Sequence, residues 1–255
     1  MNCSMSNQEY DSLYPTPPPI LEAPVARIAR SLARRAPRFY GKYKRLKYAP
    51  LYRHKSLAEP YRLVEVDPDD IDVWGIKIYY FNLELAGEIV SGNWDCLTEQ
   101  ISKTGKFRSI KNHFLHDIPW DSTEIYQHLK SEIESKGEAD GLKSLTELNK
   151  RYNRIDKIYN NIKVEGYKAQ RDLNNESCWY DEVCVSVGRD GKFIFNGSGW
   201  HRLSIAKILE LETIPVRVIL RHKVWQDKKE QLTMQQHRID DISELHPDTR
   251  HILSN

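Results

Sequence analysis

The segment between residues 181 and 220 limits the possible folds most, because the period of its apolar residues changes within a short stretch. Apolar residues alternate on both sides of the turn-forming sequence Arg189-Asp190-Gly191-Lys192, a pattern that predicts a β-hairpin. The expected elements are strands over 183–187 and 193–195, a glycine-containing loop over 196–199, a helix over 200–211 and a strand over 214–220. This order predicts an α/β fold of the α+β kind.

The loop that opens the predicted helix has a composition suited to anions. The first amide groups of a helix have no partner within the helix, and the helix dipole favours negative charge there. Gly199 allows a phosphate to approach closely, His201 adds a titratable donor, and Arg202 adds a planar cation suited to bidentate phosphate contact. The alternative is a tight structural loop in which Arg202 forms an ion pair and His201 caps the helix.

Three stretches, residues 185–195, 199–209 and 214–218, resemble the core of the ParB/sulfiredoxin superfamily. Residues 63–71, a strand pattern followed by an acidic turn, resemble the family's opening element. The resemblance implies a small mixed sheet with helices that binds the phosphates of a nucleotide at the start of the helix. The nucleotide-binding residues that it implies are Ser198, Gly199, Trp200, His201 and Arg202.

The superfamily includes sulfinic-acid reductases, serine kinases and DNA-segregation clamps that use CTP, and this chain departs from each. Trp200 stands where the reductases have their catalytic cysteine. Ser198 stands where kinase-like and nuclease-like members have an aspartate. About 30 residues follow Trp225, too few for the helix-turn-helix domain of a clamp.

The sequence therefore leaves two main functions open. The first is an NTP-dependent phosphotransferase or hydrolase that uses a nucleoside triphosphate or diphosphate with Mg²⁺. His201 and Asp70 are its candidate catalytic residues, with Asp67 and Asp69 as alternative carboxylates, although acidic residues also suit a solvated turn. The second is a nucleic-acid-associated protein without catalysis, and a scaffold that keeps the fold without activity is a further alternative.

The basic residues are concentrated near the N-terminus. Residues 1–62 contain 12 Lys and Arg against 4 Asp and Glu, so this part carries +8 and the remainder −6. An amphipathic helix is expected over 25–36, stopped before Pro37, and is followed by interleaved tyrosines and cations over 40–48. Such an arm suits nucleic acid or an anionic membrane surface, or its tyrosines pack on the body. The candidate nucleic-acid-binding residues are Arg34, Arg35, Lys42, Lys44, Arg45 and Lys47.

The chain is expected to contain one folded body. The predicted parts are a disordered Pro-rich tail over 1–24, the basic arm over 25–60, a ParB-like body over 61–225 with a helical insertion at about 90–170, and a C-terminal extension over 226–255. Ser144 and Glu147 form a capping-box pattern before a long apolar stripe, which predicts a helix that ends at Gly166.

The remaining patterns exclude several classes of protein. The four cysteines show no C-x-x-C spacing, so a reducing cytoplasmic location is expected. No apolar run is long enough for a transmembrane segment. His113, His116, Asp117 and Asp121 match no specific metal motif, and a structural role is expected for them.

Overall fold

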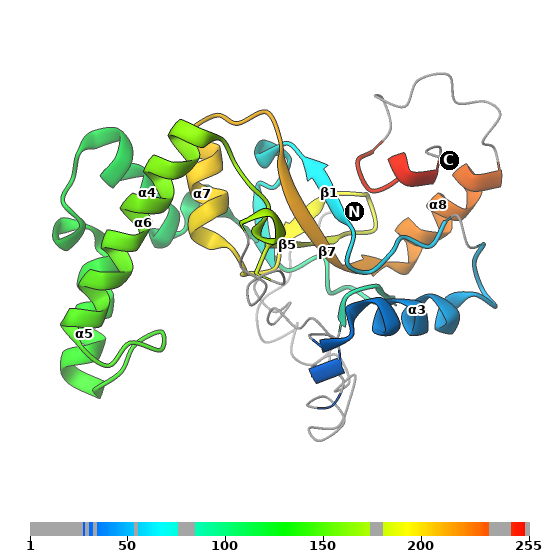
Figure 1. The fold of residues 1–255 in the computed structure, drawn as a ribbon, viewed down its shortest axis with the longest axis horizontal. Coiled ribbons are helices and arrows are strands. Elements are labelled where there is room, and N and C mark those ends of the chain that lie inside the picture. The colour runs from blue at the N-terminus through cyan, green and yellow to red at the C-terminus, as the bar shows by residue number, and fades with distance from the viewer. Residues whose placement is uncertain are drawn as a thin grey trace.

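The computed structural model describes residues 28, 31–32, 35–53, 56–75, 85–173, 181–234 and 246–252. It confirms the mixed α/β fold (Figure 1). The strands are β1 (Leu63–Val66), β2 (Val73–Gly75), β3 (Glu88–Val90), β4 (Thr98–Gln100), β5 (Val183–Val187), β6 (Phe193–Phe195) and β7 (Ile214–His222). The helices are α3 (Pro37–Tyr48), α4 (Gly105–His116), α5 (Glu124–Lys136), α6 (Leu145–Glu165), α7 (Trp200–Ile208) and α8 (Lys223–Met234).

The strands form one mixed sheet of seven strands in the order β1-β7-β5-β6-β2-β4, and β3 also pairs with β7. The predicted hairpin is confirmed, since β5 and β6 are antiparallel with Val185 opposite Phe195. β7 is buried along its whole length and is parallel to β5. A strand buried on both faces reads as a nearly continuous apolar run, which is why 214–220 could be recognised in the sequence.

Helix α7 connects the sheet to a separate group of helices. Leu203 and Ala206 of α7 belong to the apolar core of the sheet, whereas Ile205 belongs to a second core made by α4, α5 and α6. These three helices form the helical insertion, and Figure 1 shows them as a lobe on the side of α7 away from the sheet. The amino-terminal end of α7 is therefore held between the sheet and the insertion.

The helices of the insertion begin and end at local signals in the sequence. The Ser144 hydroxyl accepts a hydrogen bond from the amide of Glu147, as the capping-box pattern predicts. The Glu147 carboxylate accepts from the amide of Lys143 instead of returning to Ser144. Helix α6 ends at Glu165 as predicted, with Gly166 as its C-cap.

Helix α3 was not expected, although the stop before Pro37 is observed. Residues 28, 31, 32 and 35 are helical and residue 36 is not, and a second helix then begins at Pro37. A proline is tolerated in the first turn because its missing amide would have no partner within the helix. The predicted tail over 1–24 and the candidate nucleic-acid-binding residue Arg34 lie outside the described residues.

The C-terminal part packs onto the body. Helix α8 crosses the boundary predicted at residue 225, and Asp248 beyond it is fully buried. The Asp248 carboxylate accepts hydrogen bonds from Arg221 at the end of β7, and from Trp225 and Lys229 of α8. A buried charge network of this kind ties residues 246–252 to the sheet. Among the described residues, no helix is both long enough and apolar enough to cross a membrane.

Candidate functional site

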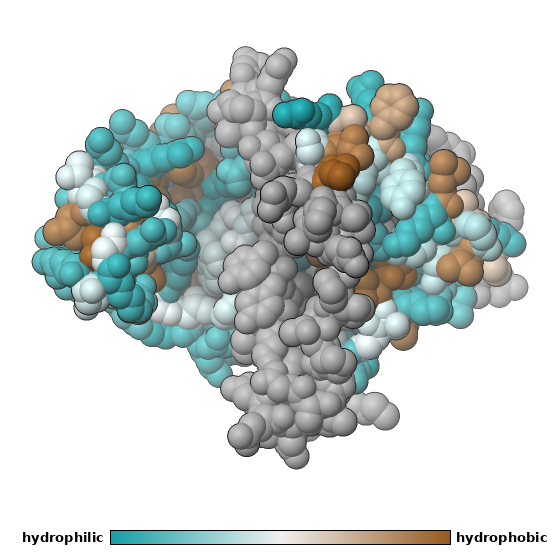
Figure 2. Space-filling model, turned by 90° about the horizontal axis from the view of Figure 1, so that it is seen from below, coloured by the Kyte–Doolittle hydropathy of each residue, from teal (hydrophilic) through white to brown (hydrophobic). Residues whose placement is uncertain are grey.

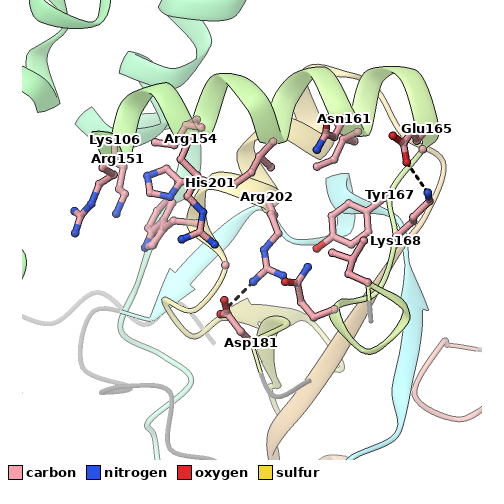
Figure 3. A pocket seen from close by; sticks show the side chains of 18 of the residues that line it. Lys106, Arg151, Arg154, Asn161, Glu165, Tyr167, Lys168, Asp181, His201 and Arg202 are labelled. Atoms are coloured by element: carbon pink, nitrogen blue, oxygen red, sulfur yellow. Dashed lines mark hydrogen bonds and ion pairs between the residues drawn. The ribbon is translucent and has the colours of Figure 1, made fainter. Parts of the chain in front are cut away.

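A cavity of about 540 Å³ lies between α6, the first turn of α7, the segment that precedes β5 and the loop that follows β6, with Lys106 of α4 also on its wall. Figure 3 shows the side chains that line it. Among the described residues of its walls, cations outnumber carboxylates. The cations are Lys106, Arg151, Arg154, Lys168 and Arg202, and the carboxylates are Asp140, Glu165 and Asp181.

The charges are distributed unevenly along the cavity. Lys106, Arg151, Arg154 and His201 gather near one end of α6, whereas the other end carries the pair formed by Glu165 and Lys168 (Figure 3). Lys168 Nζ is 2.6 Å from Glu165 Oε2, so this pair is neutral as a unit. The end of the cavity that contains Lys106 is called the cationic end below.

The cationic end has more positive than negative charge. Arg151 donates to the Asp140 carboxylate, with Nη1 2.6 Å from Oδ2. In the described part of the chain, neither Lys106 nor Arg154 has a carboxylate within ion-pairing distance. Burial lowers the pKa of Lys106, a change that Asp140 opposes and Arg151 reinforces. An anion that entered here would meet positive charge that the protein itself does not neutralise.

The start of α7 forms part of the same wall. Trp200, His201 and Arg202 all line the cavity, and within the described residues no side chain caps this end of the helix. Gly199 adopts a φ of 87°, and a Cβ atom there would lie 2.9 Å from Val183 Cα. The expected reason for this glycine was close approach of a phosphate. Its observed role is close packing of the helix start against β5.

Arg202, expected to be a free phosphate anchor, is already engaged by acidic residues. Its Nη2 is 3.2 Å from Asp181 Oδ1, and its Nη1 is 4.0 Å from Oε2 of the buried Glu182. Nη1, Glu182 Oε2 and the Tyr167 hydroxyl have no hydrogen-bond partner among the described residues. The ion-pair alternative stated for Arg202 is therefore the one observed, with one donor nitrogen left for another group.

His201 lies at the cationic end and is neutral at physiological pH. Burial lowers the pKa of its imidazole to about 3, and the charges of Lys106, Arg151 and Arg202 act in the same direction. A neutral imidazole donates through one ring nitrogen and accepts through the other. With so low a pKa, His201 is a weak proton acceptor in the unliganded protein and is better suited to hydrogen bonding.

Two of the predicted site residues do not line the cavity. The Ser198 hydroxyl donates to the backbone carbonyl of Glu182 and so fixes the loop to β5. Asp70 is exposed on a short 3-10 helix (Pro68–Asp70) that packs against α7, where its neighbour Asp69 is 3.3 Å from Lys207. The structure therefore does not bring Asp70 together with His201, and the acidic turn has the solvated surface role that was its alternative.

The candidate nucleic-acid-binding residues are divided by the packing of α3. Lys44 is 3% exposed and pairs with the buried carboxylate of Glu88, which also accepts from Lys47 at 2.7 Å. Lys44 therefore lies in the interior and not on a basic surface, contrary to the prediction. Arg35, Lys42 and Lys47 are on exposed positions, and Arg45 is half-buried.

Two of the four residues considered as metal ligands, His113 and Asp117, have structural roles. The imidazole of His113 stacks on Trp120 with ring centroids 3.9 Å apart, and its Nε2 is 3.1 Å from Asp156 Oδ1. Asp117 ends α4 in the left-handed conformation. Across the described ranges, no group of three or more His, Cys, Asp or Glu side chains is placed to hold a metal ion.

Sequence reasoning missed the three cations of the insertion, Lys106, Arg151 and Arg154. Arg151 and Arg154 lie beside the apolar stripe of α6 that was correctly expected to be core. Only the packing of α4 and α6 against α7 brings them to the start of α7, and no local pattern encodes that packing.

Comparisons with protein-family models, with curated proteins and with solved structures find no match for this chain, so the resemblance to the ParB/sulfiredoxin superfamily stays a prediction.

Proposed function

We propose that this protein binds a nucleoside phosphate in the cavity between α6 and α7, with the phosphates at the cationic end. The observation that carries the proposal is the excess of positive charge on Lys106, Arg151 and Arg154 beside the uncapped start of α7. Unpaired amides, the positive end of a helix dipole and nearby cations are the groups that bind phosphate in proteins.

The size and the lining of the cavity also suit such a ligand. About 540 Å³ is within the range of small-molecule sites, which are usually lined by apolar residues and a few polar groups. Ile155, Ile158 and Ile162 of α6 give the cavity an apolar wall that a base or ribose can contact. The predicted superfamily resemblance, which places phosphates at Gly199 to Arg202, is consistent with this location.

The proposed role of each polar residue follows from its charge state. Lys106 is the principal side-chain anchor, because it has no carboxylate partner among the described residues. Neutral His201 donates a hydrogen bond to a phosphate oxygen. Arg202 holds the loop before β5 through Asp181 and offers its remaining nitrogen to the ligand. A nucleotide carries its own Mg²⁺ on its phosphates, so the proposed site needs no separate cluster of metal ligands.

Hydrolysis or phosphoryl transfer would need a further group to activate the nucleophile. His201 with a pKa of about 3 is a poor general base until a bound anion offsets the surrounding positive charge. Asp70 does not line the cavity. Nucleotide binding is therefore the function that the geometry supports best. Hydrolysis or phosphoryl transfer is a further proposal, which an assay of phosphate release or transfer would test separately.

Isothermal titration calorimetry tests this proposal with ATP, ADP, CTP and inorganic phosphate, each with and without Mg²⁺. Lys106→Ala is expected to weaken nucleotide binding by roughly 10- to 150-fold, which is the loss of one charge-assisted hydrogen bond. Lys168→Ala is the matched control, because Lys168 lines the same cavity but is paired with Glu165. No binding at millimolar nucleotide, or equal losses in the two variants, would refute the proposal.

A further inference from the structure

Helix α3 presents an apolar face that no described part of the chain covers. Phe39, Tyr43 and Leu46 are 78%, 60% and 71% exposed, and they lie three or four positions apart on the side of the helix opposite its buried residues. Leu51, just after the helix, is 70% exposed. Single exposed apolar residues are common on soluble proteins, but a group of them on one helix face indicates an interaction surface.

This face is held rigidly outward by the contacts of the opposite face. Tyr40, Lys44 and Tyr48 are buried against the body, and the Tyr48 hydroxyl and Lys44 both donate to the buried Glu88 carboxylate. Beyond the helix, the Tyr52 hydroxyl donates to Asp227 of α8 at 2.9 Å. The apolar face of α3 therefore cannot turn inward without breaking a buried charge network.

Cations accompany the apolar residues along the helix. Residues 35–53 contain seven Lys and Arg and no Asp or Glu. Arg38 and Lys42 are exposed on one side of the apolar face, and Lys47, on the other side, is 43% exposed and paired with Glu88. Figure 2 shows the side of the molecule on which α3 lies. In the half of this view that contains α3, brown hydrophobic residues are interspersed with teal hydrophilic ones.

We propose that the outer face of α3 binds the surface of an anionic lipid membrane. A helix that lies in the interface places apolar side chains at the boundary of headgroups and acyl chains while flanking Lys and Arg contact anionic headgroups. Phe39, Tyr43 and Leu46 supply the first contact, and the exposed cations Arg38 and Lys42 supply the second. Nucleic acid accounts for the cations, and its bases could stack on the aromatic residues, but it provides no apolar phase for the exposed Leu46 and Leu51.

The binding is peripheral and reversible, since one short helix buries little apolar area. It is independent of the nucleotide site, because α3 and the cavity-lining helices α6 and α7 lie on different sides of β7 (Figure 1). Under this proposal the protein has two independent binding sites, one for a nucleotide in the cavity and one for a membrane on α3.

Co-sedimentation of the full chain with vesicles of phosphatidylcholine alone, or of phosphatidylcholine with about one third phosphatidylserine, tests the surface directly. Wild-type protein is expected to bind only the anionic vesicles, and the bound fraction should fall steeply as salt is raised from 50 to 300 mM. The double variant Phe39→Ser/Leu46→Ser should weaken binding by about tenfold or more while keeping every charge.

Two further variants separate the contributions. Arg38→Ala/Lys42→Ala should weaken binding to anionic vesicles by a similar factor and should reduce its dependence on salt. Leu115→Ser/Val164→Ser, which changes exposed apolar residues of the helical insertion, is the matched control and should bind as wild type does. Circular dichroism on each variant confirms that the fold is unchanged.

Three outcomes would overturn the proposal. The first is binding to neutral and anionic vesicles alike, or equal binding by wild type and Phe39→Ser/Leu46→Ser. The second is tight binding of duplex DNA that this variant retains, without binding to vesicles. The third is a dimer in sedimentation velocity that the same variant dissociates while vesicles remain unbound, because the face would then contact a second copy of the chain.

Discussion

Arg202 Nη2 lies 3.2 Å from Asp181 Oδ1, so the arginine at the start of α7 is paired within the protein before any ligand arrives. Lys106, on the facing helix α4, has no such partner among the described residues. The helical insertion therefore supplies most of the positive charge that is available to an anion. The loop that leads into α7 comes instead from the sheet, because it follows β6.

Asp181→Asn should strengthen nucleotide binding. The change removes a negative charge from the cavity wall and leaves Arg202 less engaged, while the side chain keeps its shape. Because Asp181 is half exposed, its effect is screened, and a gain of about two- to fivefold in affinity is expected. Calorimetry with ADP measures it. Asp121→Asn, an exposed change outside the cavity, is the control, and a loss of affinity in Asp181→Asn would contradict the assignment.

His201 should make the protein less stable as the pH falls below about 6.5. Its imidazole has a pKa of about 3 in the folded protein and near 6.5 when unfolded, so the unfolded state binds the additional proton between these values. Stability therefore increases as the pH rises through this window, by up to about 1.4 kcal/mol per pH unit. His201→Asn should remove this part of the pH dependence.

Urea unfolding at pH 4.5, 5.5 and 7 measures the difference between wild type and His201→Asn. His128→Asn changes an exposed imidazole on α5 and serves as the control. Identical pH dependence in wild type and His201→Asn would mean that His201 is not kept neutral by the fold.

Lys44 and Glu88 should contribute to the stability of the fold as a strongly coupled pair. Burial raises the pKa of this carboxyl, but Lys44 and the hydrogen bonds of Lys47 and Tyr48 hold the pKa below its usual value. Glu88→Gln leaves the Lys44 ammonium buried without its counterion and should destabilise the protein by about 3–5 kcal/mol. The double variant Lys44→Met/Glu88→Gln should recover much of this loss, which a double-mutant cycle of urea unfolding measures. Additive effects would show that the two groups do not interact.

Asp248→Asn should release the C-terminal segment. The substitution leaves Arg221 and the fully buried Lys229 without their carboxylate, at a cost of about 3–5 kcal/mol. Asp69→Asn, which breaks the exposed pair with Lys207, should cost less than about 1 kcal/mol. Hydrogen exchange should show faster exchange in α8 for Asp248→Asn only. Equal stability of the two variants would mean that residues 246–252 do not stabilise the body.

The parts of the fold that were predictable from sequence are those with local signals. The hairpin of β5 and β6 follows from alternation around a turn, and the end of α6 follows from Gly166. The stop before Pro37 was predicted correctly, but the second helix that begins there was missed, because a proline that ends one helix also suits the first turn of the next.

The candidate site was only partly predictable, because it is assembled by tertiary packing. Trp200, His201 and Arg202 were found because they are adjacent in the sequence and open a helix. Lys106 comes from a different helix, and its place beside them depends on how α4 packs against α7. Asp70 was grouped with them on chemistry alone, but its turn packs on α7 away from the cavity.

The central claim, that a phosphate-bearing ligand binds where α4 and α6 meet the start of α7, is tested most directly by amide chemical shifts during a titration with ADP. The account predicts saturable shifts in residues 199–202 and at Lys106, with α3 unchanged. Lys106→Ala should move the titration midpoint to at least about tenfold higher ADP. Shifts confined to the N-terminal basic residues, or shifts in residues 199–202 that Lys106→Ala leaves at the same midpoint, would contradict it.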